Sequence, residues 1–169
     1  GGNLNAAKQQ SMGIGTQTAA LIVGGNPALA TNESYDGSSW SEIANINTGR
    51  RDGSGFGTQT AGAIVGGQPP TTGIQEAWDG SSWTEVGDLN TARHLLGASG
   101  TQTAAIAAGG EAPYKNLSEE FNGTAWTEGD NLPLAKSNGG FLCPQTAALF
   151  AAGNPGPAGQ TNASYDGSS

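Results

Sequence analysis

The sequence contains few of the residues that carry enzymatic chemistry. It has one histidine, His94, and one cysteine, Cys143, which fall in different parts of the chain. Zinc sites and Cys–His nucleophile pairs need such residues in clusters. We therefore expect no catalytic residue, no metal site and no cofactor. His94 is expected to be a partly exposed strand residue, and Cys143 a packed or turn thiol.

Paired carboxylates are a second possible source of chemistry, because most glycosidases act through two of them. Glu119 and Glu120 are adjacent in the sequence. Successive side chains of a strand point to opposite faces of a sheet. If this segment is a strand, the two residues therefore form no catalytic dyad, and each is either a solvated edge residue or a partner between neighbouring sheets.

The basic residues show a regular pattern. The chain has six of them in total, and four fall at equivalent points of a repeated unit. One interpretation is structural, with each side chain bonded to carbonyl groups or to a carboxylate such as Asp52 or Asp88. The other is a band of positive charge on one rim, which would bind an anionic or polyhydroxylated ligand. The four residues are Lys8, Arg50, Arg93 and Lys136.

Four loops give a second candidate site on the same rim. They differ in length and sequence while the units around them repeat, a pattern that often marks a binding face. Sequence drift is the alternative explanation. Tyr114 and Lys115 are the most ligand-like residues of these loops. The loops span residues 26–32, 68–73, 111–116 and 154–162.

These residues belong to a repeat with a period of 42 or 43 residues, marked by Gln17, Gln59, Gln102 and Gln145. Each unit continues with an apolar run, a glycine pair that decays to Ala152-Gly153 in the last unit, and an aromatic residue before a turn. A tryptophan closes the first three units. The units span approximately residues 8–43, 50–86, 93–129 and 136–169.

Each unit is expected to form four short strands, which in the third unit cover residues 93–99, 102–108, 116–121 and 125–128. Tight turns, 29 glycines and the absence of helical periodicity support this interpretation. The predicted fold is all-β, a propeller of four-stranded antiparallel blades. In such a meander the basic residues and the variable loops lie at one end, and the Asp-Gly-Ser-Ser turns lie at the other.

The second unit resembles the kelch repeat. The resemblance rests on Arg50, Phe56, the segment 64–67, the segment 77–79 and Trp83, although the spacing from aromatic to tryptophan is short for kelch. It implies a propeller of about six or seven blades. Galactose oxidase shares this fold, but its copper site needs two histidines, and this chain has one. Because the residues of a catalytic site are missing, we expect a non-catalytic binding or structural module.

A weaker resemblance rests on short sequence motifs that recur in the repeats. Gly-Thr-Gln-Thr-Ala, Tyr-Asp-Gly-Ser-Ser-Trp and Asn-Thr-Ala-Arg are similar to kelch-like arrays in structural or tail-associated proteins of bacterial viruses. This implies a virion or extracellular location and a host-surface glycan or protein as ligand. The alternative is the non-catalytic part of a carbohydrate-active enzyme whose active-site residues lie outside this chain.

The net charge and the end of the sequence bear on the expected partners and on the number of repeats. The net charge of −8 argues against nucleic acid and anionic membranes as partners, and no apolar run approaches the roughly 18 residues of a membrane span. We expect a protein or glycan ligand on one face, with self or virion subunits as further partners. The sequence stops at Ser169, where a closing tryptophan is expected. It is interpreted either as part of a longer array or as a chain that closes with four blades or pairs with a second copy.

Overall fold

The computed structural model describes residues 2–111, 114–142, 145–151, 153–154 and 162–165. Over these residues the protein is all-β, as predicted, and its one helical segment is the short 3₁₀ helix η1 (Gln145–Ala147). Every sheet is an antiparallel meander whose strands follow the order of the sequence. Within the described residues, no helix has the length and apolar character needed to cross a membrane.

Within the described ranges, three sheets have four strands, and the fourth has three. The first sheet contains β1 (Met12–Thr16), β2 (Ala19–Val23), β3 (Asn32–Tyr35) and β4 (Trp40–Ile43). The second contains β5 (Ser54–Gly57), β6 (Gly62–Val65), β7 (Gln75–Trp78) and β8 (Trp83–Glu85). The third contains β9 (Gly97–Thr101), β10 (Ala104–Ala108), β11 (Ser118–Phe121) and β12 (Trp126–Gly129). The fourth contains β13 (Gly140–Leu142), β14 (Ala148–Ala151) and β15 (Ala163–Tyr165).

The first strand of each unit starts later than the sequence suggested. In the third unit β9 begins at Gly97 rather than at Arg93, and Gly100 and Thr101 belong to the strand rather than to the turn. The reason is Leu95, whose φ of 55° interrupts the extended backbone. Its equivalents Asp52 and Asn138 have φ values of 58° and 57°. The chain therefore bends once before each of these first strands.

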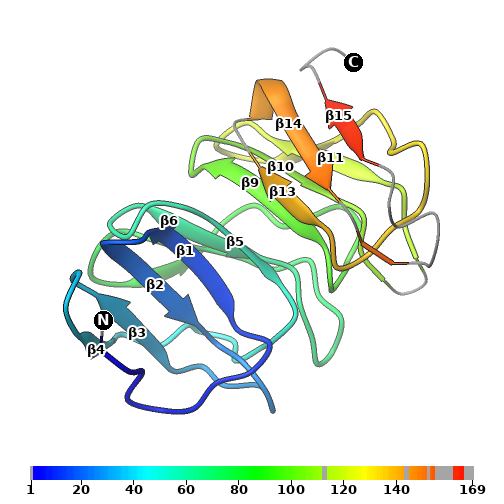
Figure 1. The fold of residues 1–169 in the computed structure, drawn as a ribbon. Helices are drawn as coiled ribbons and strands as arrows, with labels where there is room; N and C mark the ends of the chain where they lie inside the picture. Colours follow the sequence, from blue (N-terminus) through cyan, green and yellow to red (C-terminus); the bar gives the residue numbers. More distant parts are fainter. Residues whose placement is uncertain (1, 112–113, 143–144, 152, 155–161, 166–169) are drawn as a thin grey trace.

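The first strands of the four sheets lie in a row, with β5 between β1 and β9 and with β9 beside β13 (Figure 1). A ladder of backbone hydrogen bonds joins the bends that precede them. The N–H of Asp52 donates to the carbonyl of Gln10 at 3.1 Å, that of Leu95 to Asp52 at 2.6 Å, and that of Asn138 to Leu95 at 2.8 Å. The same bond thus links each sheet to the one before it.

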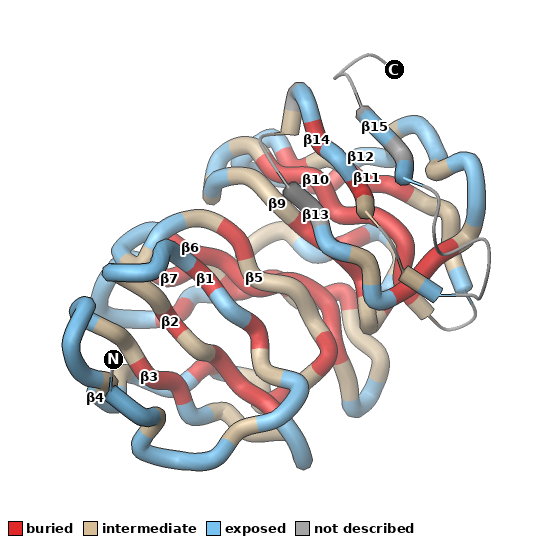
Figure 2. Tube along the Cα trace, viewed as in Figure 1, coloured by how far each residue is buried: buried red, intermediate tan, exposed pale blue. Residues whose placement is uncertain are grey.

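The core consists of layers between successive sheets (Figure 2). Ile14 and Leu21 of the first sheet share a cluster with Ile64 and Trp83 of the second. A second cluster joins the second and third sheets and includes Trp126. Because both faces of the inner sheets are covered, β6 is buried at every position. This explains why its sequence is continuously apolar rather than alternating.

The glycine pairs allow neighbouring sheets to approach each other closely. Gly66 has a φ of +67°, and a Cβ at this position would lie 2.6 Å from the carbonyl oxygen of Arg93. Gly109 repeats the geometry, with the carbonyl oxygen of Lys136 at 2.6 Å. Residues with a side chain rarely adopt this φ, and here they would also collide with backbone. The pair is therefore a packing requirement of the interface between sheets.

Candidate functional site

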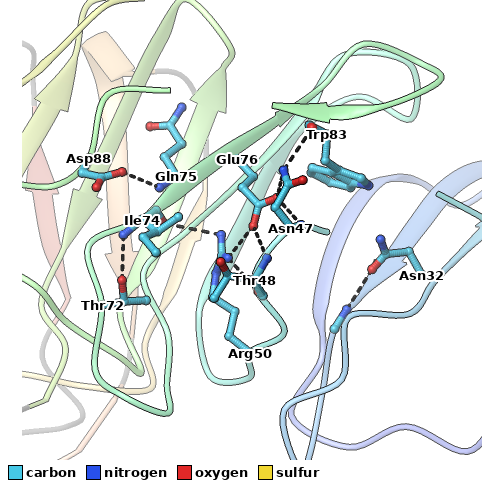
Figure 3. A network of polar contacts seen from close by, with 11 residues as sticks. Asn32, Asn47, Thr48, Arg50, Thr72, Ile74, Gln75, Glu76, Trp83 and Asp88 are labelled. Atoms are coloured by element: carbon cyan, nitrogen blue, oxygen red, sulfur yellow. Dashed lines mark hydrogen bonds and ion pairs between the residues drawn. The ribbon is translucent and has the colours of Figure 1, made fainter. Parts of the chain in front are cut away.

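Arg50, one of the four predicted basic residues, lies inside the protein. Its Nη1 donates to Glu76 Oε1 at 2.6 Å, and the two side chains are 1% and 0% exposed. Nη1 also donates to the carbonyl oxygen of Thr48 at 3.0 Å, and Nη2 to that of Ile74 at 3.5 Å. Figure 3 shows the guanidinium group enclosed between the segment that leads into the second sheet and strand β7.

Arg93 repeats this arrangement in the third sheet. Its Nη2 lies 2.9 Å from Glu119 Oε1, and its Nη1 donates to the carbonyl oxygens of Gly109 and Leu117 at 3.0 and 2.9 Å. Burial lowers the pKa of both Arg50 and Arg93, and the paired glutamate opposes that shift. Arginine nevertheless stays charged in proteins. Each site is therefore a buried ion pair supported by carbonyl groups.

The other oxygen of the buried glutamate holds the linker between sheets. Glu76 Oε2 accepts hydrogen bonds from the backbone N–H of Asn47 at 2.7 Å and from its Nδ2 at 2.8 Å. Asn47 Nδ2 also donates to the carbonyl oxygen of Trp83 at 3.1 Å. Asn90 makes the same contacts with Glu119. Glu119 was predicted as an edge residue or a partner between sheets, and Glu76 was not singled out, although the first three units carry a glutamate at this position.

The two lysines are also withdrawn from the surface. Lys8 is half-buried, and its Nζ donates to the carbonyl oxygen of Thr31 at 2.7 Å. Burial lowers the pKa of Lys8, and the negative charges of Glu33 and Glu42 oppose that shift. Lys136 is 2% exposed. The burial of Arg50, Arg93 and Lys136, and the carbonyl contact of Lys8, favour the structural interpretation over a charged rim that faces a ligand.

The acidic partners differ from those suggested by the sequence. Asp52 accepts a hydrogen bond at 3.2 Å from Nε of Arg51, the neighbour of the predicted residue. Asp88 Oδ1 accepts the backbone N–H of Gln75 at 3.1 Å. Neither carboxylate forms an ion pair with Arg50. The actual partner, Glu76, lies on the third strand of the same sheet.

The predicted placement at one end of the molecule agrees with the backbone contacts. The carbonyl oxygen of Arg50 accepts the N–H of Gly25 at 2.9 Å, and that of Arg93 accepts the N–H of Gly67 at 2.9 Å. These glycines open the variable loops, so loops and basic residues share an end. A Cβ on Gly37, in the Asp-Gly-Ser-Ser turn, would lie 3.2 Å from the carbonyl oxygen of Thr18, in the turn between β1 and β2. That turn therefore lies at the opposite end.

The side chains that vary between units gather at this loop end. The residue after each basic position is Gln9, Arg51, His94 or Ser137, and backbone hydrogen bonds pair it with the first residue of a loop. Arg51 is 25% exposed, and its Nη1 donates to Asn26 Oδ1 at 2.9 Å. His94 Nδ1 lies 3.2 Å from Thr71 Oγ1. We call this surface the loop end; its first residues are Asn26, Gln68, Glu111 and Asn154.

Tyr114 and Lys115, the predicted loop residues, also lie at the loop end. Tyr114 is 45% exposed. Lys115 is half-buried and pairs through its backbone with Lys136, whose N–H donates to the carbonyl oxygen of Lys115 at 3.0 Å. Of the six predicted binding residues, Tyr114 therefore presents the most accessible side chain.

The remaining candidates for chemistry are separated. Glu119 is buried against Arg93, while Glu120 lies on the other face of β11 and accepts a hydrogen bond from Gln145 Nε2 at 3.3 Å. Burial raises the pKa of Glu120, and the negative charge of Asp130 adds to the shift. Cys143 lies outside the described residues. Across the part of the chain that the structure describes, no group of three His, Cys, Asp or Glu side chains could hold a metal ion.

Comparison with known proteins assigns no family to the chain. No protein-family model matches the sequence, and no curated protein is significantly similar to it.

Proposed function

We propose that this chain is a non-catalytic, kelch-like propeller module that binds a protein or glycan ligand through its loop end. The resemblance of its repeats to those of viral arrays suggests an appendage of a virion or of another extracellular particle. The proposal is supported by a difference in location between the repeated polar residues and the variable ones. The repeated polar residues, such as Arg93 and Glu119, are used up in contacts within the protein. The variable ones are displayed together at one end.

The sheet arrangement supports a propeller. Each sheet is a meander that starts with its strand in the central row, and successive sheets pack face to face. In a propeller the first strands surround an axis, and the connections at one end form a common surface. The loop end would then be one face of the propeller, where loops of four blades meet.

The side chains at the loop end suit a polar ligand. Tyr114 offers an aromatic ring with a hydroxyl group, and such rings bind ligands that are apolar on one side and polar on the other. Arg51, His94 and Lys115 add hydrogen-bond donors at the same end of the molecule, and Glu111 adds an acceptor. Sugars and the polar surfaces of proteins need this mixture of donors, acceptors and ring faces. A nucleic acid is a poor fit, because the chain carries a net charge of −8.

A glycan array and a panel of bacterial surface extracts, each scored for binding and for cleavage, test the proposal. We expect binding without cleavage, and a loss of at least tenfold in affinity for Tyr114→Ala combined with Arg51→Ala. Thr103→Ala, an exposed change at the opposite end, is the matched control and should bind like the unmodified protein. Cleavage of a bound glycan would instead support a carbohydrate-active enzyme. If the variant with Tyr114→Ala and Arg51→Ala binds as tightly as the unmodified protein, the ligand site lies outside the loop end.

A further inference from the structure

The open face of the first sheet has the composition of an interior interface. By register, Ile22 and Trp40 occupy the positions that Ile64 and Trp83 hold in the second sheet. Ile64 and Trp83 are 0% and 6% exposed, because the first sheet covers them. Ile22 and Trp40 are only half-buried, since no other described sheet covers this face. A groove of about 510 Å³ borders this face; Gly13, Ile22 and Trp40 line one part of it, and residues of β5 and β9 line the rest.

Gly13 shows how closely a neighbouring sheet would approach this face. At the equivalent Gly55, a Cβ would lie 2.5 Å from the carbonyl oxygen of Gly13 and 2.7 Å from Ile14 Cγ1, both in the first sheet. A Cβ at Gly13 would meet nothing within 4 Å. The space in front of Gly13 is therefore the space that a first strand occupies at the interior interface.

The polar groups that bind a preceding sheet are also present on this face. Gln102 Nε2 donates to the carbonyl oxygens of Gly62 and Trp78, at 2.6 and 2.7 Å, and Gln59 and Gln145 likewise reach the preceding sheet. Gln17 holds the same position in the first unit and is exposed. Trp126 Nε1 donates to Gln75 Oε1 at 2.6 Å. Among the described residues, nothing accepts a hydrogen bond from Trp40 Nε1 or from the backbone N–H of Gln10.

The opposite end of the row carries the matching groups. Asn138 holds the position whose carbonyl oxygen would accept the next N–H of the backbone ladder, and no described residue donates to it. Leu149, the equivalent of Leu21 and Ile106, is 36% exposed. Asn162 occupies the position of Asn32 and Gln75 and is exposed. Tyr165 holds the place of Tyr35, Trp78 and Phe121, whose carbonyl oxygens accept the interface glutamines.

We propose that the open face of the first sheet binds the fourth sheet of a second copy of this chain, head to tail. The contacts would repeat those between the sheets of one chain: Gln17 to the carbonyl oxygen of residue 165, and Gln10 to the carbonyl oxygen of Asn138. A second copy is the occupant because the fourth sheet of the same chain carries the acceptors for Gln17 and Gln10 and an exposed apolar residue, Leu149. The proposal does not depend on ligand binding at the loop end.

Sedimentation velocity of the 169-residue chain between about 5 and 200 μM tests the association. We expect species at multiples of the 16.8 kDa monomer. Their share should rise with protein concentration and also with salt, which screens the repulsion between copies that each carry a charge of −8. A monomer over the whole range would overturn the proposal.

Gly13→Leu separates this interface from other modes of association. The added side chain meets nothing in the monomer but would enter the space that the second copy needs, so we expect a monomer at 200 μM with an unchanged circular dichroism spectrum. Thr84→Leu adds the same bulk to an exposed site on β8 and should associate normally. Gln17→Ala should weaken association about fivefold, the loss expected for one hydrogen bond of ~1 kcal/mol. Association of Gly13→Leu at the wild-type level would contradict the proposal.

Fluorine-labelled tryptophan gives a readout at the interface itself. The chain has four tryptophans, and only Trp40 lies on the open face. Assignment through Trp40→Phe identifies its fluorine resonance. We expect this resonance to move with protein concentration while those of Trp83 and Trp126 stay fixed. Association that leaves the Trp40 resonance unchanged would place the contact on another surface.

Discussion

Arg93 and Glu119 place two opposite charges in an environment that water does not reach. Removing one member of such a pair leaves the other charge buried without its partner, which typically costs about 3–5 kcal/mol. We therefore expect Arg93→Met to lower the free energy of unfolding by that amount, measured by urea denaturation. Arg93→Met combined with Glu119→Gln should be more stable than Arg93→Met alone, because the glutamine is neutral and its carbonyl oxygen still accepts from Asn90. Equal stability of the two variants would argue against a buried ion pair.

Asp36 makes a pH-dependent contribution at the opposite end of the molecule. Its Oδ1 accepts hydrogen bonds from the backbone N–H groups of Ser39 and Ser38, at 2.8 Å each, which lower its pKa from 3.8 to about 2. Because the folded pKa is the lower one, this contribution to stability is complete above pH 4 and is lost as the pH falls towards 2. A carboxyl titration by NMR should show a midpoint near 2 for Asp36.

Asp36→Asn is the matched control for this titration. At the equivalent position Asn122 Oδ1 accepts the N–H groups of Thr124 and Ala125, at 3.0 Å each, so an asparagine supports the same turn without a charge. We expect this variant to fold normally and to lose the part of the acid dependence that comes from residue 36. An Asp36 midpoint near 3.8 would show that the turn does not hold the carboxylate.

At the scale of the elements, the glutamine before each second strand ties one sheet to the next. Gln102→Ala leaves the carbonyl oxygens of Gly62 and Trp78 without their side-chain donor, so we expect a loss of about 1–3 kcal/mol in the free energy of unfolding. Gln17→Ala is the matched control and should change the stability of the monomer by about 0.5 kcal/mol or less, because Gln17 is exposed. Urea denaturation at low protein concentration compares the two. Equal losses would mean that the glutamine acts within its own unit.

Comparison of the predicted and observed strands shows which features the sequence could predict. The all-β sheets and the shared end of the loops and basic residues followed from the repeat, because equal positions in equal units take equal places. The start of β9 was predicted too early, since nothing in the sequence marks Leu95 as a residue with positive φ. The partner of Arg93 was also missed. Its identity depends on which face of β11 presents Glu119, a property of side-chain direction rather than of spacing.

The exposure of the candidate site could not be predicted either. Lys8, Arg50, Arg93 and Lys136 have the spacing of a charged rim, and a spacing does not tell whether a side chain points out or in. The burial of Arg50 and Arg93 is decided by the linker that crosses each sheet and by the glutamate beneath it, which are contacts between segments about 30 residues apart. Tyr114 was easier to place, because loops run over the surface of a protein and their side chains tend to be exposed.

Over the whole molecule, stability should decrease from the middle of the row towards its ends. In repeat proteins each unit is stabilised by its neighbours, so units with two neighbours open less often than those with one. We expect amide hydrogen exchange to be slowest in β6 and β10 and faster in β4 and β14, measured where the protein is monomeric. Uniform exchange across the sheets would indicate a single cooperative unit. Raising the protein concentration should slow exchange in β2 if copies join head to tail.

The ladder through Gln10, Asp52, Leu95 and Asn138 also gives the row a direction, because each N–H donates to the residue of lower number. A whole repeat inserted between two others therefore finds an acceptor on one side and a donor on the other. Duplicating residues 50–92 in tandem would lengthen the row by one sheet while keeping the residues found at existing junctions. A gene for this fold can grow or shrink in steps of one repeat, and each step adds one more loop whose sequence is free to diverge.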